Sequence, residues 1–452
     1  MKIHIASLGC ARNQIDSEIM LGRLKKTGAV ITGDPAEAEV IVVNTCSFIE
    51  SAADESIDTI LELAKNKQQG ACRRLVVTGC LPERYREDIT KAIPEVDVFL
   101  GTGAFDRIVE AAGGYLDTAK CILPDPDTIS LSTSGIERSA ESSPHMAYLK
   151  TAEGCDRHCT YCIIPKLRGR QKSRPLEDIL DEARQLIQTG VRELVLVSQE
   201  TTAYGRDFAV STNFAGLLES LVGLAKEPIA GPSPVADHQQ FWIRFLYGHP
   251  ESLDQRTIAA VARHACICSY IDVPIQHASR AVLKRMGRQY GSKELYAMVD
   301  HIRRTIPDVA LRTTVIVGFP GETDAEFGEL MDFVETVQFD HLGCFLYSDA
   351  EDLPSHVLAG HVSAPKAKER YRHLMKRQQN ISAARNRNYR DQTLSVLIEE
   401  HPENGVYTGR TEFQASEVDG ITYIHADNLR TGSFAAVRIT DTLEYDLVGI
   451  AV

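Results

Sequence analysis

Residues 153–170 read EGCDRHCTYCIIPKLRGR and place Cys155, Cys159 and Cys162 in a C-x3-C-x2-C pattern directly after the apolar run MAYLKTA (146–152). Thiolates are the usual ligands of iron–sulfur clusters, and three of them hold three irons of a cubane while one iron stays open to another ligand. A structural zinc ion would require a fourth thiolate or imidazole, and His158 is sterically awkward in that role. Three unrelated buried thiols are the plain alternative. The spacing predicts a cluster on these cysteines.

Three further cysteines stand far apart in the sequence, yet each comes just past its own apolar run. Cys10 ends IHIASLGC, Cys46 ends VIVVNTC and Cys80 ends LVVTGC. In a parallel sheet these positions meet at the carboxyl edge, where open α/β sheets bind their ligands. Gly9 and Gly79 allow the sharp turns and the close approach that a bulky inorganic core requires. We therefore expect a second cluster, although strand ends are also ordinary places for buried free thiols.

The chain has three regions with different patterns. From residue 1 to about 120, short β-branched runs alternate with helical segments, which predicts an open parallel α/β sheet. Residues 121–145 are rich in Ser, Pro and Asp and are expected to be a linker. Six strand-like runs alternate with helical patterns within 146–380, which predicts a partial (β/α)6 barrel, and an eight-unit barrel is excluded only by count. EPIAGPSPVADHQQ (227–240) is expected to be a surface insertion.

A long charged helix (about 364–390) leads into the last region, 381–452, where four strand-like runs are separated by Gly and Asn turns. This pattern predicts a small antiparallel β-barrel. From Asp391 to Val452 there are eleven Asp or Glu against three Arg and no Lys, a net charge of -8. A surface this acidic repels phosphate backbones and attracts a basic protein.

The whole chain has 452 residues and a net charge of -13, which disfavours a general nucleic-acid coat but leaves a local basic groove open. No run approaches the roughly 18 apolar residues of a membrane span, and the opening MKIHIASLGC has no signal-peptide pattern. We expect a cytoplasmic protein that does not enter a membrane. Eleven cysteines in such a chain indicate metal or redox chemistry more than disulfides. Five of them show no metal-site geometry: Cys72, Cys121, Cys266, Cys268 and Cys344.

At these cysteines the chain resembles the radical S-adenosylmethionine superfamily, whose signature is this spacing with an aromatic residue, here Tyr161, before the last cysteine. It is similar, more closely and along essentially its whole length, to the methylthiotransferases of that superfamily. The segments that carry the resemblance are SLGCARNQIDSE, VNTCSFIESAADES, VTGCL, AEGCDRHCTYCIIPKLRGRQKSRP, LVSQETTAYG, DVPIQHAS, TTVIVGFPGET and GCFLYS.

Two branches of this family differ in substrate. SLGCARN with DSE, NTCSFI and PIQHAS resemble the RimO branch, which modifies an aspartate of ribosomal protein S-twelve; the other branch, MiaB-like, modifies an adenosine in tRNA. The acidic last region independently favours the protein substrate. A third alternative is an iron–sulfur scaffold without transferase activity.

The resemblance implies two 4Fe-4S clusters and S-adenosyl-L-methionine as cofactors. It also implies the division of the chain: a methylthiotransferase N-terminal domain (1–120), a linker (121–145), a radical SAM core (146–380) and a TRAM domain (381–452). The cluster of the core would cleave S-adenosylmethionine to give a radical that abstracts hydrogen from the substrate β-carbon, and the second cluster would supply the sulfur. Flavodoxin or ferredoxin is the type of electron donor implied.

Catalytic residues other than the cluster ligands are not evident, and no acid–base pair stands out, as expected for hydrogen-atom chemistry. Gly318, Gly321 and Glu322 lie either along the cofactor or in a tight turn before a helix. Gln199 and Arg244, each near a strand end, are further candidates. The basic run from Lys166 to Arg174 is expected to be a solvated or cofactor-facing loop, with a nucleic-acid contact as the alternative.

Overall fold

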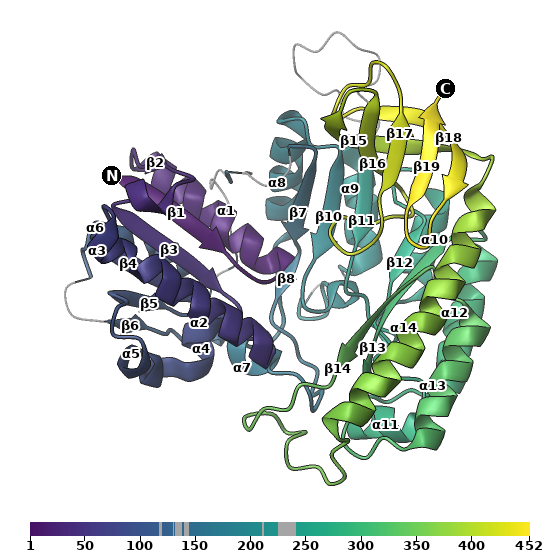
Figure 1. Cartoon of the computed structure of the whole chain (residues 1–452), viewed down its shortest axis with the longest axis horizontal. Coiled ribbons are helices and arrows are strands. Elements are labelled where there is room, and N and C mark those ends of the chain that lie inside the picture. The colour runs from purple at the N-terminus through teal and green to yellow at the C-terminus, as the bar shows by residue number, and fades with distance from the viewer. Residues whose placement is uncertain (117–119, 130, 132–137, 140–143, 210–211, 225–240) are drawn as a thin grey trace.

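The computed structural model describes residues 1–452 except 117–119, 130, 132–137, 140–143, 210–211 and 225–240. Three bodies follow one another along the chain: a first sheet with its helices, a partial barrel in the middle, and a small closed barrel beside it (Figure 1). Residues 130, 132–137 and 140–143 of the predicted linker and the whole predicted insertion at 227–240 lie outside the described residues. Within the part of the chain that is described, no helix is both long and apolar enough to cross a bilayer.

The first body is a six-stranded sheet in the order β2-β1-β3-β4-β5-β6, with every neighbouring pair parallel. Its strands are β1 (Lys2–Ser7), β2 (Val30–Ile31), β3 (Val40–Thr45), β4 (Arg74–Gly79), β5 (Val98–Leu100) and β6 (Cys121–Ile122). Its helices are α1 (Ala11–Lys26), α2 (Glu50–Ala64), α3 (Asn66–Gln69), α4 (Cys80–Tyr85), α5 (Ile89–Ala92) and α6 (Ile108–Gly113). Both faces of the sheet carry apolar cores, as the continuous β-branched runs predict.

The predicted linker overlaps this sheet. Cys121–Ile122, the first two of its residues, pair with Phe99 and Leu100 of β5 and form the edge strand. A two-residue edge strand carries too few apolar positions to show the period of a strand in the sequence.

The middle body is the partial barrel, built from β7 (Met146–Lys150), β10 (Glu193–Val197), β11 (Trp242–Phe245), β12 (Tyr270–Asp272), β13 (Ala310–Val317) and β14 (His341–Leu346). They form two three-stranded parallel sheets, joined by a parallel bridge between Ile243 and Ile267, so the six predicted strands follow in chain order. A short ribbon, β8 (Ala152–Glu153) with β9 (Lys172–Ser173), brackets the cysteine loop. The helices are α7 (Ile164–Arg168), α8 (Leu176–Gln188), α9 (Phe214–Leu224), α10 (Gln255–Arg263), α11 (Arg280–Arg285), α12 (Ser292–Thr305), α13 (Asp324–Val337) and α14 (Ala364–Asn386).

The last body is a closed barrel of β15 (Thr393–Glu403), β16 (Val406–Thr411), β17 (Thr422–His425), β18 (Phe434–Thr442) and β19 (Leu447–Ala451). Two details differ from the prediction. The last of the four predicted runs is two strands, because the chain turns between Thr442 and Leu447. The barrel is also not wholly antiparallel, since β17 and β19 pair in parallel where the ring closes. Helix α14 runs along the partial barrel into this body and crosses the predicted boundary at 380/381 (Figure 1).

Buried ion pairs attach the small barrel to the amino-terminal ends of the middle strands. Glu193, at the start of β10, accepts from Arg244 Nε at 2.6 Å and also pairs with Arg410 of β16. Burial opposes ionisation of Glu193, but the two guanidinium groups hold its pKa at about 2. Arg244 donates further to the Glu412 carbonyl at 2.8 Å. The candidate Arg244 is the third of the four residues of β11 and so lies near a strand end, but both of its hydrogen-bond partners belong to this interface, which makes it a structural residue.

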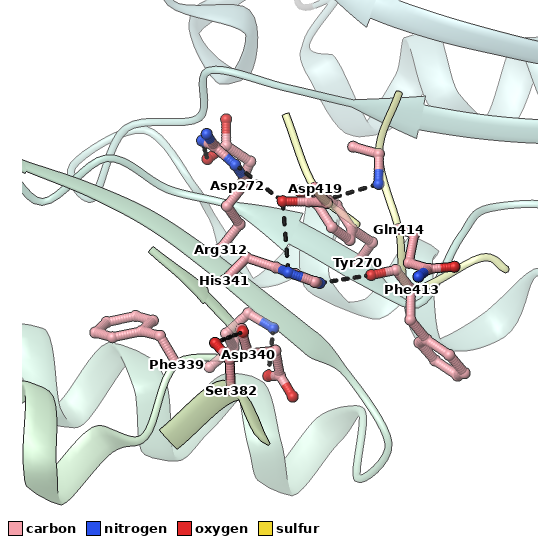
Figure 2. A network of polar contacts seen from close by, with 12 residues as sticks. Tyr270, Asp272, Arg312, Phe339, Asp340, His341, Ser382, Phe413, Gln414 and Asp419 are labelled. Carbon is pink, nitrogen blue, oxygen red and sulfur yellow. Dashed lines mark hydrogen bonds and ion pairs between the residues drawn. The ribbon is translucent and has the colours of Figure 1, made fainter. Parts of the chain in front are cut away.

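A second network lies at the same interface and centres on Asp419 (Figure 2). Asp419 accepts from Tyr270 Oη at 2.7 Å and forms ion pairs with Arg312 Nε at 3.4 Å and His341 Nδ1 at 3.5 Å. His341 Nε2 lies 2.8 Å from the Phe413 carbonyl. The segment of the small barrel between β16 and β17 is thus held inside the base of the partial barrel.

Arg410→Met should lower the free energy of unfolding by about 3–5 kcal/mol, because the buried Glu193 loses one of its two cations. The single tryptophan, Trp242, reports the loss, since its ring packs 4.7 Å from that of Phe434 in β18. Urea unfolding followed by its fluorescence measures the change. Arg304→Met is the control: its pair with Asp300 has side chains 70% and 66% exposed, so a change within about 0.5 kcal/mol is expected. Equal effects of the two substitutions would contradict this account of the interface.

Candidate functional site

The three distant cysteines of the first body lie at one edge of its sheet. Strands β1, β3 and β4 are neighbours, and Cys10, Cys46 and Cys80 follow directly after their carboxyl ends. Gly9, the residue before Cys10, packs against Cys46: a Cβ added to Gly9 would stand 2.7 Å from the Cβ of Cys46 and 3.2 Å from its sulfur, and both Cys10 and Cys80 are close enough to Cys46 to affect its ionisation. The parallel sheet therefore brings these thiols together as the pattern predicts.

Two buried asparagines and a threonine tie the three strand ends to one another. Asn13 Nδ2 donates to the carbonyls of Leu8 (3.0 Å) and Thr45 (2.9 Å). Asn44 Nδ2 donates to the Asn13 carbonyl at 2.7 Å. Thr45 Oγ1 donates to the Thr78 carbonyl at 2.6 Å. These side chains join the turns that carry the three cysteines, and Asn13 Oδ1 also accepts from Arg168 of the partial barrel, so contacts on both sides fix the positions of the cysteines.

The other three cysteines occupy the loop between β8 and α7, at the carboxyl end of the first strand pair of the partial barrel. Cys155 N–H donates to the Gly169 carbonyl at 3.1 Å, and Thr160 N–H donates to the Met286 carbonyl at 3.1 Å. Burial and the neighbouring thiols raise the pKa of Cys155 to about 11 and that of Cys162 to about 12. Bare thiols here would hold their protons, so a positively charged metal centre is needed to keep them as thiolates.

The cysteines that follow the strands of the first sheet have different charges around them. Burial and the nearby Cys80 and Cys10 raise the pKa of Cys46 to about 11. Burial also disfavours ionisation of Cys10, but the charges of Arg12 and Arg168 outweigh it and lower its pKa. Both guanidinium groups come from segments next to the cysteines and would balance the negative charge of a thiolate-bound cluster.

Within the described ranges, no group of three or more His, Cys, Asp or Glu side chains is arranged to hold a single metal ion. A cubane makes a different demand, because each thiolate binds its own iron and the sulfurs need not meet at one point. The donor set fits such a group at both places: three soft sulfur ligands, glycines with left-handed backbone at Gly9, Gly79 and Gly154, and buried cations beside the first triad.

Arg168 stands between the two cysteine groups. Its guanidinium donates to Asp16 at 3.0 Å, lies 3.6 Å from the Cys80 sulfur and is 3% exposed. The residue after it, Gly169, accepts the amide proton of Cys155. One turn of chain thus contacts both groups, which places the two predicted cluster sites on either side of α7.

The basic run that includes Arg168 is therefore not a solvated loop throughout. Arg168 and Arg174 are buried, and Arg174 donates to the Lys150 carbonyl at 2.7 Å and pairs with Glu182. Lys166 and Arg170 have the exposure that a solvated loop would give. Arg168 is buried against Asp16, Asn13 and Cys80, and the sequence did not separate it from its neighbours because alternate basic residues look alike in a loop.

Buried charges surround Arg168, and sequence reasoning missed them. Asp16 of α1 binds both Arg168 and, at 2.5 Å, the ammonium of Lys150 at the end of β7. Lys150 also donates to Glu153 at 2.7 Å. The available signal was a lysine inside the apolar run MAYLK and a glutamate directly before the cysteine loop, since charged groups in buried strands are paired or functional.

The remaining candidates have defined places. Gln199 follows β10 and donates to Glu153, so it borders the same charged cluster. Glu322 accepts from the amides of Gly318 and Phe319 and also pairs with Arg370 of α14. The VIVGFPGE segment is thus a tight strand-to-helix turn closed by its own glutamate, the second of the two interpretations of that segment.

Comparison with known proteins places the chain in a family. Residues 2–101 match the uncharacterized protein family UPF0004, 149–334 the radical SAM superfamily, and 392–452 the TRAM domain. The chain is 49% identical over 453 residues to the ribosomal protein uS12 methylthiotransferase RimO of Desulfosudis oleivorans, covering 100% of both chains. It is 45% identical to the RimO of Clostridioides difficile, over 99% of this chain and 98% of that one. The chain belongs to the RimO family of methylthiotransferases.

This membership confirms the predicted family, the radical SAM enzyme class, and iron–sulfur clusters and S-adenosylmethionine as the cofactor types of a RimO protein. The fold also resembles a solved radical S-adenosylmethionine methyltransferase, TsrM, from Kitasatospora setae, with a TM-score of 0.58 at 15% identity over 79% of this chain and 77% of that one. At that identity the likeness bears on the fold alone. It supports the predicted radical SAM barrel of the RimO chain.

Gly79→Ala should destabilise the first sheet and displace Cys80. Gly79 has φ 98° and ψ −146°, a region used almost only by glycine, and its added Cβ would stand 2.5 Å from Asn44 Oδ1 and 2.6 Å from the Thr45 carbonyl. The backbone alone costs about 1–3 kcal/mol. Gly28→Ala is the control, with φ 83° but no atom within 4 Å of the added Cβ. Thermal unfolding should show the larger loss for Gly79→Ala; equal losses would mean that the contact with β3 is unimportant.

Proposed function

We propose that this chain transfers a methylthio group to the β-carbon of an aspartate in ribosomal protein S-twelve, using two 4Fe-4S clusters. Cys155, Cys159 and Cys162 would hold one cluster, and Cys10, Cys46 and Cys80 the other. When bound, the first cluster with S-adenosylmethionine would supply the radical that removes a hydrogen atom, the second cluster would supply the sulfur, and another S-adenosylmethionine would supply the methyl group. An electron donor such as flavodoxin or ferredoxin would reduce the first cluster.

The observation that carries the proposal is the contact of one chain turn with both cysteine groups. Arg168 reaches Cys80 with its side chain, and Gly169 accepts from the Cys155 amide. Radical abstraction and sulfur delivery act on one carbon atom, so both cofactor sites must border the same substrate position. The barrel end that carries the cysteine loop is also where βα loops gather in such folds.

The protein's own residues hold the reactants in position and shield them from water. Asp16, Lys150, Glu153 and Arg168 form a buried charged cluster that fixes the first sheet against the partial barrel. Such a dry, fixed environment excludes water from the radical chemistry and lets no proton donor move freely. The residues near both groups thus orient the reactants and do not transfer protons.

The charge of the last region supports a protein substrate. A net charge of -8 from Asp391 to Val452 attracts a basic ribosomal protein and repels the tRNA backbone. The RimO names of the relatives agree with this choice. The ribosomal substrate implies that the reaction takes place in the cytoplasm.

Mass spectrometry of a deletion strain tests the substrate. Ribosomal protein S-twelve should lose the mass of one methylthio group in place of one hydrogen, while methylthio-adenosine in tRNA stays unchanged. The reverse result would establish the tRNA branch. If neither substrate changes and the reconstituted protein does not cleave S-adenosylmethionine, the remaining alternative is an iron–sulfur scaffold without transferase activity.

The substitution Cys10→Ala should separate the cleavage of S-adenosylmethionine from the transfer of the methylthio group. The variant should bind about half the iron of the unchanged protein and retain reductive cleavage of S-adenosylmethionine, but lose methylthio transfer, because only the second cluster lacks a ligand. Cys159→Ala should lose both activities. Iron analysis and assays of both reactions on reconstituted protein measure this. Cys121→Ala, a partly buried thiol outside both groups, is the control and should keep both. Loss of both activities in Cys10→Ala would count against separate roles.

A further inference from the structure

Arg12 carries a positive charge to the place where the first sheet meets the partial barrel. It lies in the first turn of α1, two residues after Cys10. Its Nη1 donates to the Ser198 carbonyl at 2.8 Å, just past β10, and its Cζ lies 4.7 Å from the centre of the Tyr247 ring, just past β11. The guanidinium therefore spans from the second cysteine group to the carboxyl ends of two barrel strands.

The charge of Arg12 is not balanced by a carboxylate. Neighbouring cations all have one: Arg168 and Lys150 pair with Asp16 and Glu153. In the described part of the chain, Arg12 has no carboxylate within ion-pair distance, and its contacts are the Ser198 carbonyl and the Tyr247 ring. Burial opposes the charge of Arg12, and the nearby Cys10 and Glu153 offset that cost, so the guanidinium stays charged although it bonds no carboxylate.

The helix itself does not stabilise the positive charge of Arg12. The first turn of α1 contains no acidic residue, and a cation there faces the positive end of the helix dipole. The helix therefore does not favour arginine at this position, and the charge of Arg12 is stabilised by groups outside the helix, Cys10 and Glu153 among them.

The ring beneath Arg12 is held in a strained position. Tyr247 has φ 62°, in the left-handed region that bulky residues avoid. Its amide donates to Asp272 Oδ2 at 2.8 Å, and its carbonyl accepts from the Thr201 amide at 3.0 Å. Strain of this kind persists where neighbouring contacts fix it and is typical of ligand-binding positions.

The contacts that hold Tyr247 in place extend to the small barrel. Asp272 Oδ1 accepts from Arg312 Nη1 at 3.1 Å, and Arg312 Nε lies 3.4 Å from Asp419 (Figure 2). Two bodies of the molecule thus fix one aromatic platform, and Arg12 of the first body stacks on it. A guanidinium stacked on such a platform is preorganised and loses little freedom when it binds an anion.

We propose that Arg12 binds the side-chain carboxylate of the substrate aspartate and so selects aspartate over uncharged residues. A guanidinium presents five N–H donors in a planar fork that matches a carboxylate with two parallel hydrogen bonds, and only one of them is used by Ser198. The guanidinium lies beside Cys10 of the second cysteine group and at the carboxyl ends of β10 and β11, on the side of the barrel that also carries the other cysteine loop. The inference rests on the proposed function, because it names the group by which the same site recognises its substrate.

Peptide binding to the reconstituted protein tests the inference. Fluorescence anisotropy gives the Kd of an S-twelve peptide with aspartate at the target position and of the same peptide with asparagine. The unchanged protein should bind the aspartate peptide at least about tenfold more tightly, the usual size of a hydrogen bond to a charged group. Arg12→Met should reduce this ratio to about one and raise KM more than it lowers kcat, and Arg12→Lys should retain part of the ratio.

Arg256→Met is the matched control, since Arg256 is the second residue of α10 as Arg12 is of α1, but is exposed. It should keep the full ratio. A ratio that survives in Arg12→Met would overturn the inference. Loss of iron, or an altered electron paramagnetic resonance signal of the second cluster, in both Arg12 variants would make Arg12 a support of Cys10, which also overturns it. An unchanged protein that modifies no aspartate peptide would instead overturn the proposed function.

Discussion

The shared carboxylate of Asp16 is the interaction on which the arrangement of this molecule depends. Asp16 belongs to α1 of the first sheet, yet it binds Lys150 at the end of the first barrel strand and Arg168 of the cysteine loop. Removing one member of such a buried group leaves the others without a partner, which is far more costly than any gain from forming it. The network therefore fixes the position of one domain on the other more than it adds to stability.

This fixed position gives the two cysteine groups a common border. The triad of the first sheet is held by backbone and amide contacts among three strand ends, and the other by a loop folded against α7 and Gly169. Either group alone is an ordinary feature of its fold. Their joint position at one barrel end is what makes sulfur transfer to a radical chemically reasonable.

The small barrel acts from the opposite end of the middle strands. Its Arg410 completes the charge balance of Glu193, and its Asp419 joins Tyr270, Arg312 and His341 (Figure 2). Through Arg312 and Asp272 these contacts continue to Tyr247, beneath Arg12. The C-terminal region thus has a structural connection to the reaction side as well as a charge that suits a basic partner.

The sequence by itself determined the parallel first sheet, the six barrel strands, the C-terminal barrel and the two sets of cysteines, because each depends on local period or spacing. It did not find the edge strand β6 or the parallel closure of β17 on β19, which follow from pairing between distant segments. Only the tertiary structure showed which contacts the charged residues make. It joined Arg244 to Glu193 and to the Glu412 carbonyl of the small barrel, buried Arg168 beside Cys80, and left Arg12 on Tyr247 without a carboxylate. The role of a charge depends on which distant groups surround it, and that is settled by the packing of whole domains.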